Sequence, residues 1–256
     1  MSAVLRVEWI ETNALGALRI TDAVTSRAVA APVMISAPGL RLLRKSVAEY
    51  VIMGADNLGA GLDVPIDVRP LGGAYLPRRI TVHLPRDANP ANAAQPTSIF
   101  RPVAIPLPPS PSYPVSGSPA LLRVTVRRST DNARVGGAVV RLRTAPAPAP
   151  DFHSMTDAVG EALIVVPGVP LTSPGPNATV LRDIAASLDV LVDPALATFT
   201  ADAGIDAARA SALARRDGFI DPDDVIARLG PTAPAATTVR VGAGRVDTVI
   251  ATWVPA

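Results

Sequence analysis

The run Leu122-Arg123-Val124-Thr125-Val126-Arg127 has the clearest alternation of apolar and polar residues in the chain of 256 residues. Because successive side chains of a β-strand point to opposite faces, this alternation predicts a strand with one face in a core and one in solvent. The same pattern recurs on both sides of the run, with glycine, proline and asparagine between the alternating segments. The chain is therefore predicted to be mainly β, with short antiparallel strands packed as β-sandwiches.

The alternating segments before the proline-rich middle of the chain predict an N-terminal β-sandwich-like domain over residues 1–88. Its expected strands include Leu5–Trp9, Leu18–Ile20 and Ile80–Leu84. Residues 18–29 repeat the pattern of Arg123–Val135, which is a strand, a polar turn and a return to apolar residues. Internal duplication and independent origin of the two halves both remain open.

A second sandwich is predicted over residues 120–256. Besides the strand at Leu122, its expected strands are Ala138–Arg143, Ala162–Val166, Leu188–Val192, Thr237–Val241 and Val246–Val254. The glycine-rich segment Gly242–Arg245 is predicted to be the turn of a hairpin between the last two strands, since no helix follows it as a phosphate site would require.

Ten of the 27 prolines lie between Pro85 and Pro119. Proline fixes φ and has no N–H to donate, so this density favours polyproline II and predicts a stiff connector over residues 89–119. Binding of this segment to an aromatic groove is the alternative. The uncharged run Pro102–Leu122 is as long as a membrane span, but its seven prolines exclude a spanning helix, and no membrane span is predicted.

A small helical insertion is expected at about residues 195–231 of the second sandwich. Asp206 is predicted to cap a first helix, which is rich in alanine and continues to Arg216. The second helix has Asp221 as N-cap, Pro222 at its first position and Gly230-Pro231 as its stop.

The composition leaves little chemistry, because the chain has no cysteine and only two histidines. His83 is expected on the polar face of a strand and His153 in an exposed loop, and no Gly-x-Ser-x-Gly turn occurs. A group of carboxylates, Asp217, Asp221, Asp223 and Asp224, does not follow the spacing of a calcium-binding EF-hand. The chain is therefore predicted not to be an enzyme, with no catalytic, cofactor-binding or metal-binding residues.

Charge is nearly balanced, with 24 basic and 22 acidic residues and a net charge of +2. This balance argues against nucleic acid as a partner, and no small-molecule substrate is predicted. Four arginines, Arg127, Arg128, Arg141 and Arg143, are candidates for a basic strip on one sheet face, with contact to a neighbouring subunit as the alternative to nucleic acid. The charges near the start of the chain interrupt any signal peptide, so the protein is expected in the cytoplasm.

Three segments resemble one known family. They are Val135-Gly136-Gly137-Ala138-Val139, then Thr156-Asp157-Ala158-Val159-Gly160, then Pro167-Gly168. In this order they resemble the carboxypeptidase regulatory-like domain, over roughly residues 122–168. The resemblance implies a transthyretin-like β-sandwich and the role of an accessory module that packs, stiffens or binds. It brings no catalytic residues.

The layout of the whole chain is similar to small β proteins of phage-tail-like contractile injection systems. The similarity is carried by the segments Val64–Arg69, Gly73–Pro77 and Ile80–Pro85, followed by the proline-rich link. It implies a structural component of such a particle, in the baseplate, the cap or another part, that acts by docking to other protein subunits. The alternative function is a ligand-binding or adhesion module that recognises glycan or peptide through the sandwich loops.

Overall fold

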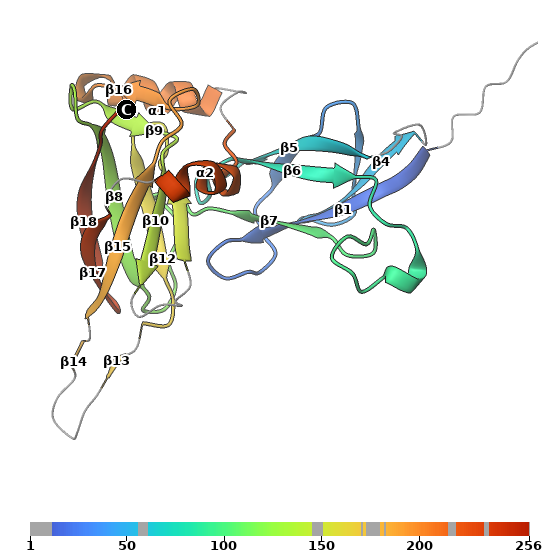
Figure 1. Cartoon of the computed structure of the whole chain (residues 1–256), viewed down its shortest axis with the longest axis horizontal. Helices are drawn as coiled ribbons and strands as arrows, with labels where there is room; N and C mark the ends of the chain where they lie inside the picture. The colour runs from blue at the N-terminus through green and yellow to red at the C-terminus, as the bar shows by residue number, and fades with distance from the viewer. Residues whose placement is uncertain are drawn as a thin grey trace, which may run out of the picture.

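The structure of the chain is a computed structural model. It describes residues 12–55, 61–144, 151–169, 171–172, 180–181, 183–214, 219–232 and 236–255. Strands dominate it, and the predicted mainly β, sandwich-type fold is confirmed. Figure 1 shows the strands gathered in two bodies, β1–β7 in one and β8–β18 in the other, with α2 between them. The strand expected at Leu5–Trp9 lies outside the described residues.

The N-terminal sheet pair consists of two sheets. One has the order β3 (Arg41–Arg44), β4 (Glu49–Ala55), β1 (Thr12–Asp22), β7 (Val103–Leu107), and the other the order β2 (Val33–Ser36), β5 (Leu62–Pro70), β6 (Arg78–Leu84). The apolar residues of the alternating segments bury themselves between the sheets, as the pattern predicts. Leu18 and Ile20 of β1 are fully buried, and Ile66 and Leu84 of the facing sheet are buried with them.

Part of the stretch predicted as a connector belongs to this sheet pair. Residues 90–92 form the short 3₁₀ helix η1 (Pro90–Asn92), and β7 pairs in parallel with β1 from Leu18↔Val103 to Asp22↔Leu107. The proline in β7, Pro106, is tolerated because β7 is an edge strand, where a missing N–H breaks no ladder. Residues 103–107 are therefore a strand of the first core and not polyproline II.

The buried carboxylate of Asp22 anchors the residues after β7. It accepts hydrogen bonds from the hydroxyls of Tyr75 (3.0 Å) and Tyr113 (2.6 Å) and from the backbone N–H groups of Val24 (2.7 Å) and Thr25 (3.1 Å). The two tyrosine rings meet edge to face, with centroids 5.6 Å apart. The chain thus stays attached to the N-terminal sheet pair as far as residue 113.

This cluster predicts a loss of stability in alkali. Burial, and then the hydrogen bond to the Asp22 carboxylate, raise the pKa of Tyr75 to about 12 from its ordinary value of 10.0. The unfolded chain loses the phenolic proton at a lower pH than the folded chain does. The stabilising contribution of Tyr75 is therefore fully present below pH 10 and is lost as the pH rises from about 10 to 12. Denaturation midpoints across this pH range should fall, and Tyr75→Phe should make the fall shallower. An equal slope in both proteins would contradict the assignment.

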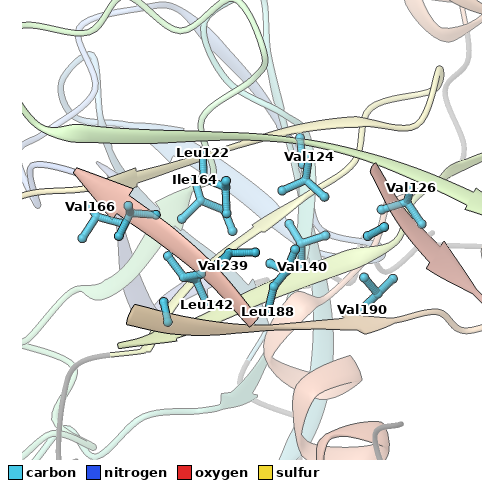
Figure 2. Packing of buried hydrophobic residues seen from close by; sticks show 14 of the residues in the cluster. Leu122, Val124, Val126, Val140, Leu142, Ile164, Val166, Leu188, Val190 and Val239 are labelled. Atoms are coloured by element: carbon cyan, nitrogen blue, oxygen red, sulfur yellow. The ribbon is translucent and has the colours of Figure 1, made fainter. Parts of the chain in front are cut away.

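The C-terminal sheet pair encloses the larger core. One sheet has the order β11 (Asp151–Met155), β10 (Val139–Thr144), β15 (Asp183–Leu191), β17 (Thr237–Gly242). The other contains β12 (Glu161–Val166), β8 (Ala120–Arg128), β9 (Arg134–Gly136), β16 (Thr198–Thr200) and β18 (Val246–Trp253), while β13 (Leu171–Thr172) pairs only with β14 (Val180–Leu181). Figure 2 shows Leu122 and Val124 of β8 pointing between the sheets toward Leu142 and Leu188. The apolar residues of the alternating run that begins at Leu122 thus lie in the core, and its polar residues lie on the outer face of the sheet.

The hairpin predicted at Gly242–Arg245 is wrong. β17 pairs with β15 in one sheet, whereas β18 crosses to the other sheet and pairs in parallel with β8, from Val246↔Leu121 to Trp253↔Arg128. Gly244, with φ +65°, makes the crossing turn. The expectation of purely antiparallel pairing is therefore wrong here and at β7. The segment Asp157–Gly160 forms a turn, in which Gly160 has φ +76° and its N–H donates to the Asp157 carbonyl (3.1 Å).

The helical insertion lies where it was expected. η2 (Asp202–Gly204) leads directly into α1 (Ile205–Ala214), so Asp206 lies within the first turn and is not the N-cap. The predicted end of this helix falls on residues outside the described part. α2 (Pro222–Leu229) begins as predicted, with Asp221 accepting from the N–H groups of Asp223 and Asp224, and runs into η3 (Gly230–Thr232). None of the described helices is long and apolar enough to cross a membrane.

Candidate functional site

The two sheet pairs meet at α2. The helix lies against the outer face of the β11-β10-β15 sheet, where Val139, Met155 and Leu191 pack against Val225 and Ile220. Leu76, which precedes β6 of the N-terminal sheet pair, completes this buried cluster. We call the contact between Leu76–Arg79 and residues 219–226 the joint.

At the centre of the joint lies Arg78, whose side chain is only 1% exposed. Its Nη2 donates to Asp223 Oδ2 (2.8 Å) and to Asp221 Oδ1 (3.4 Å), and its Nη1 donates to the carbonyl of Pro106 on β7 (2.9 Å). A buried guanidinium is very costly without such partners, and here two carboxylates and a carbonyl supply them. One side chain therefore connects β6, β7 and the start of α2.

Two further contacts cross the joint beside Arg78. The backbone N–H of Arg79 donates to the Ile220 carbonyl (2.8 Å), so the start of β6 is bonded to the residues before α2. The guanidinium of Arg69 lies 5.1 Å from the centre of the Phe219 ring, a cation–π contact. Apolar packing, ion pairs and a backbone hydrogen bond thus fix the two sheet pairs relative to each other.

A cleft of about 200 Å³ opens beside the joint. Apolar groups and prolines from both sheet pairs make up much of its wall, with Arg78, Asp151 and His153 as its charged or titratable members. The placement of His153 in an exposed loop is wrong, since His153 belongs to β11 and its side chain is 32% exposed. Its Nε2 lies 3.7 Å from Asp223 Oδ1, and burial lowers the pKa of the imidazole below its usual value.

His83 lies on the outward face of β6, as predicted. Its Nδ1 is 2.8 Å from Asp63 Oδ1, and both side chains are exposed. The two histidines therefore occupy separate places: His83 lies beside Asp63, and His153 interacts with the carboxylates of Asp223 and Asp151. Among the described residues, no group of three or more histidine, aspartate or glutamate side chains is placed to hold a metal ion.

The acidic group at the second helix serves the joint. Asp221 combines its role as N-cap with the ion pair to Arg78, and Asp223 makes the shorter ion pair to the same guanidinium. Asp224 pairs with Arg228 one turn later (2.8 Å). Asp217 lies outside the described residues.

The predicted basic strip is wrong. Arg127 and Arg128 lie on β8, whereas Arg141 and Arg143 lie on β10 of the other sheet. Each of them has a carboxylate partner within the chain: Arg127 pairs with Asp202, Arg128 with Asp131, and Arg141 and Arg143 share the buried Asp189. These arginines hold the C-terminal sheet pair and its helical insertion together, so they leave no basic strip for a neighbour.

Sequence reasoning missed Arg78 as a site residue, although a signal was present. Ile80, Val82 and Leu84 face the core, and a period of two places Arg78 on the same face. A charged residue at a core-facing position requires a partner, and the pattern alone does not show that Asp221 and Asp223 supply it.

Comparison of the chain with protein-family models, with curated proteins and with solved structures finds no match, so the two resemblances noted in the sequence stay predictions.

Proposed function

We propose that the chain is a non-enzymatic structural subunit of a larger protein assembly, specifically of a phage-tail-like contractile particle. The observation that supports the proposal is the joint, where Arg78 of one sheet pair is bonded to Asp221 and Asp223 beside the other. A subunit that transmits position from one neighbour to another needs such a stiff connection. Contacts between domains are commonly small, and the domains then move relative to each other. The buried Arg78, with ion pairs to Asp221 and Asp223 across the joint, is instead expected to restrict such motion.

The surface supports docking to other subunits. Large apolar side chains are exposed on both sheet pairs, among them Met34 (59%), Leu71 (58%) and Phe100 (57%) on the first and Ile250 (65%) and Val254 (66%) on the second. Single exposed apolar residues are ordinary, but a row of them along one sheet edge is a feature of interaction surfaces. The segments that resemble injection-system proteins, Val64–Arg69 and Ile80–Pro85, supply β5 and β6, next to the joint.

The proposal is tested by following the tagged full-length chain through density-gradient fractionation of a lysate of its native cells. We expect it to sediment with large particles that show a tube and sheath in negative-stain images, and we expect deletion of its gene to leave these particles incomplete. Arg78→Ala should reduce incorporation, while the neighbouring control Arg79→Ala should incorporate normally. Recovery of the chain only as a small free protein, with intact particles in the deletion strain, would overturn the proposal.

A further inference from the structure

The last strand, β18, is an edge of its sheet within the described part of the chain, and the side chains of its outward row are uncharged. It lies at the outer side of its sheet in Figure 1, and β8 is the only strand of the described chain that pairs with it. Its exposed side chains alternate along the strand and continue one residue past it. They are Val246, Thr248, Ile250, Thr252 and Val254, and all five are uncharged.

The backbone polar groups of these same residues point to the free edge. The carbonyls of Arg245 and Trp253 accept from Leu121 N–H and Ser129 N–H, both at 2.9 Å, so the odd-numbered residues face β8. Because the N–H and C=O of alternate residues point to opposite sides of a strand, the even-numbered residues present theirs to the open side. The free edge is thus a ready template for another strand.

Four other edge strands are short, carry charge or contain proline. β2 and β3 have four residues each, and β3 begins and ends with arginine. β7 contains Pro106, and β17 exposes Arg240. These are the usual means by which proteins prevent pairing at sheet edges. β18 has eight residues, and its exposed row contains neither a charged residue nor proline.

We infer that β18 pairs antiparallel with β18 of a second copy of this chain, about a twofold axis at Ile250. The exposed row reads Val-Thr-Ile-Thr-Val and is the same in both directions. In this register Ile250 meets its own copy, Thr248 meets Thr252 of the second copy, and Val246 meets Val254. Every pair is of like size and β-branched, which favours cross-strand packing, and the even-numbered residues form about ten backbone hydrogen bonds. A twofold contact requires such self-complementarity.

Charge is compatible with this pairing. The charged residues at the start of β18, Arg245 and Asp247, already pair with each other (2.8 Å), and Arg245 also pairs with Asp183 (3.2 Å). Asp247 belongs to the opposite row and would stand across from Trp253 of the second copy, so no like charges meet. The nine paired residues extend over about 30 Å. A single pair of strands of this length buries less surface area than a standard interface of roughly 1,600 Å². The dimer is therefore expected to be reversible.

Sedimentation equilibrium of the purified full chain over a range of concentrations tests the pairing. We expect a monomer–dimer equilibrium, and we expect Ile250→Lys to abolish the dimer because it sets two ammonium groups opposite each other. The control is Leu43→Lys on β3, where the wild-type side chain is 51% exposed, comparable to Ile250. It should dimerise like the unaltered chain. Thermal melts check that both variants fold.

The absence of cysteine allows a test of the register by single thiols. Ile250→Cys should be cross-linked efficiently to a dimer by a short bismaleimide, since the paired Cα atoms lie about 5.5 Å apart. Thr248→Cys and Thr252→Cys should each react poorly alone, because identical positions are displaced by about 13 Å along the strands. A mixture of the two should cross-link.

The inference is overturned if the unaltered chain is monomeric throughout, if Ile250→Lys dimerises unchanged, or if cross-linking shows no preference for these positions. The self-pairing deepens the proposed assembly function and rests on that function for its biological role. The experiments that test the two proposals can nevertheless fail independently. A monomer that still sediments with particles would reject the self-pairing alone, and a dimer absent from every particle would reject the particle role alone.

Discussion

Arg78→Ala is expected to lower the free energy of unfolding by about 2–4 kcal/mol, because it removes a buried side chain together with its hydrogen bonds to charged partners, while Asp223, whose side chain is 57% exposed, can regain water. The substitution removes a side chain that is 1% exposed and bonded to Asp223, Asp221 and the Pro106 carbonyl. Asp221, which is 16% exposed, would keep its capping bonds but lose its ion pair with Arg78. The Pro106 carbonyl would lose its side-chain donor.

The neighbouring arginine provides the control. Arg79 pairs with Asp67 through two hydrogen bonds of 2.7 and 2.9 Å, but its side chain is 43% exposed. Arg79→Ala should therefore cost at most about 1 kcal/mol. Urea denaturation measures both variants, with small-angle scattering to detect an altered angle between the sheet pairs. Equal effects of the two substitutions would show that burial of Arg78 contributes nothing to the joint.

Asp22→Ala is expected to lower the free energy of unfolding by about 2–4 kcal/mol, because it removes the acceptor of four hydrogen bonds at a site that is 6% exposed. The hydroxyls of Tyr75 and Tyr113 would lose a charged acceptor, and the loop after β1 would lose two backbone bonds. The segment from Pro108 to Tyr113 should then detach from the first sheet pair more readily.

Two variants separate these contributions. Asp22→Asn keeps one acceptor oxygen and should be intermediate, while Tyr113→Phe removes one hydrogen bond and should cost about 1 kcal/mol. Denaturant midpoints give the stabilities, and limited proteolysis reports release of the segment after β7. Wild-type stability in Asp22→Ala, or unchanged proteolysis, would contradict the anchoring role.

Much of the fold could be predicted from local patterns. A period of two placed the strands at Leu18, Ile80 and Leu122, and the capping signals placed Asp221 and Pro222 at the start of α2. These features depend on residues next to each other in the chain, so a single sequence contains them.

What depended on distant partners could not be predicted. The density of prolines indicated a free connector, but Val103–Leu107 pairs with β1 as an edge strand. This pairing does not require an N–H from Pro106. The glycine turn before β18 indicated a hairpin, but the strand found β8 in the other sheet. The joint depends on residues separated by 143 positions, a distance over which no periodic pattern carries information.

The aromatic residues show the same limit. Tyr75 and Tyr113, which are far apart in the sequence, meet at Asp22, and Phe199 stacks on Trp253 with ring centroids 5.9 Å apart. Arg128 lies 4.0 Å from the centre of the Phe199 ring, so this pair is also tied to β8. Pairwise contacts of this kind arise from the topology of the sheets.

The Arg78 contact also sets an order of events during synthesis. The ribosome makes β6 and β7 long before it makes Asp221, 143 residues after Arg78, so until then the guanidinium has neither its two carboxylates nor the start of α2 beside it. Before α2 docks, the charge can stay hydrated, and docking of the second half then exchanges its water for the carboxylates of Asp221 and Asp223. The contacts of the joint therefore form only after residues 219–226 have been made.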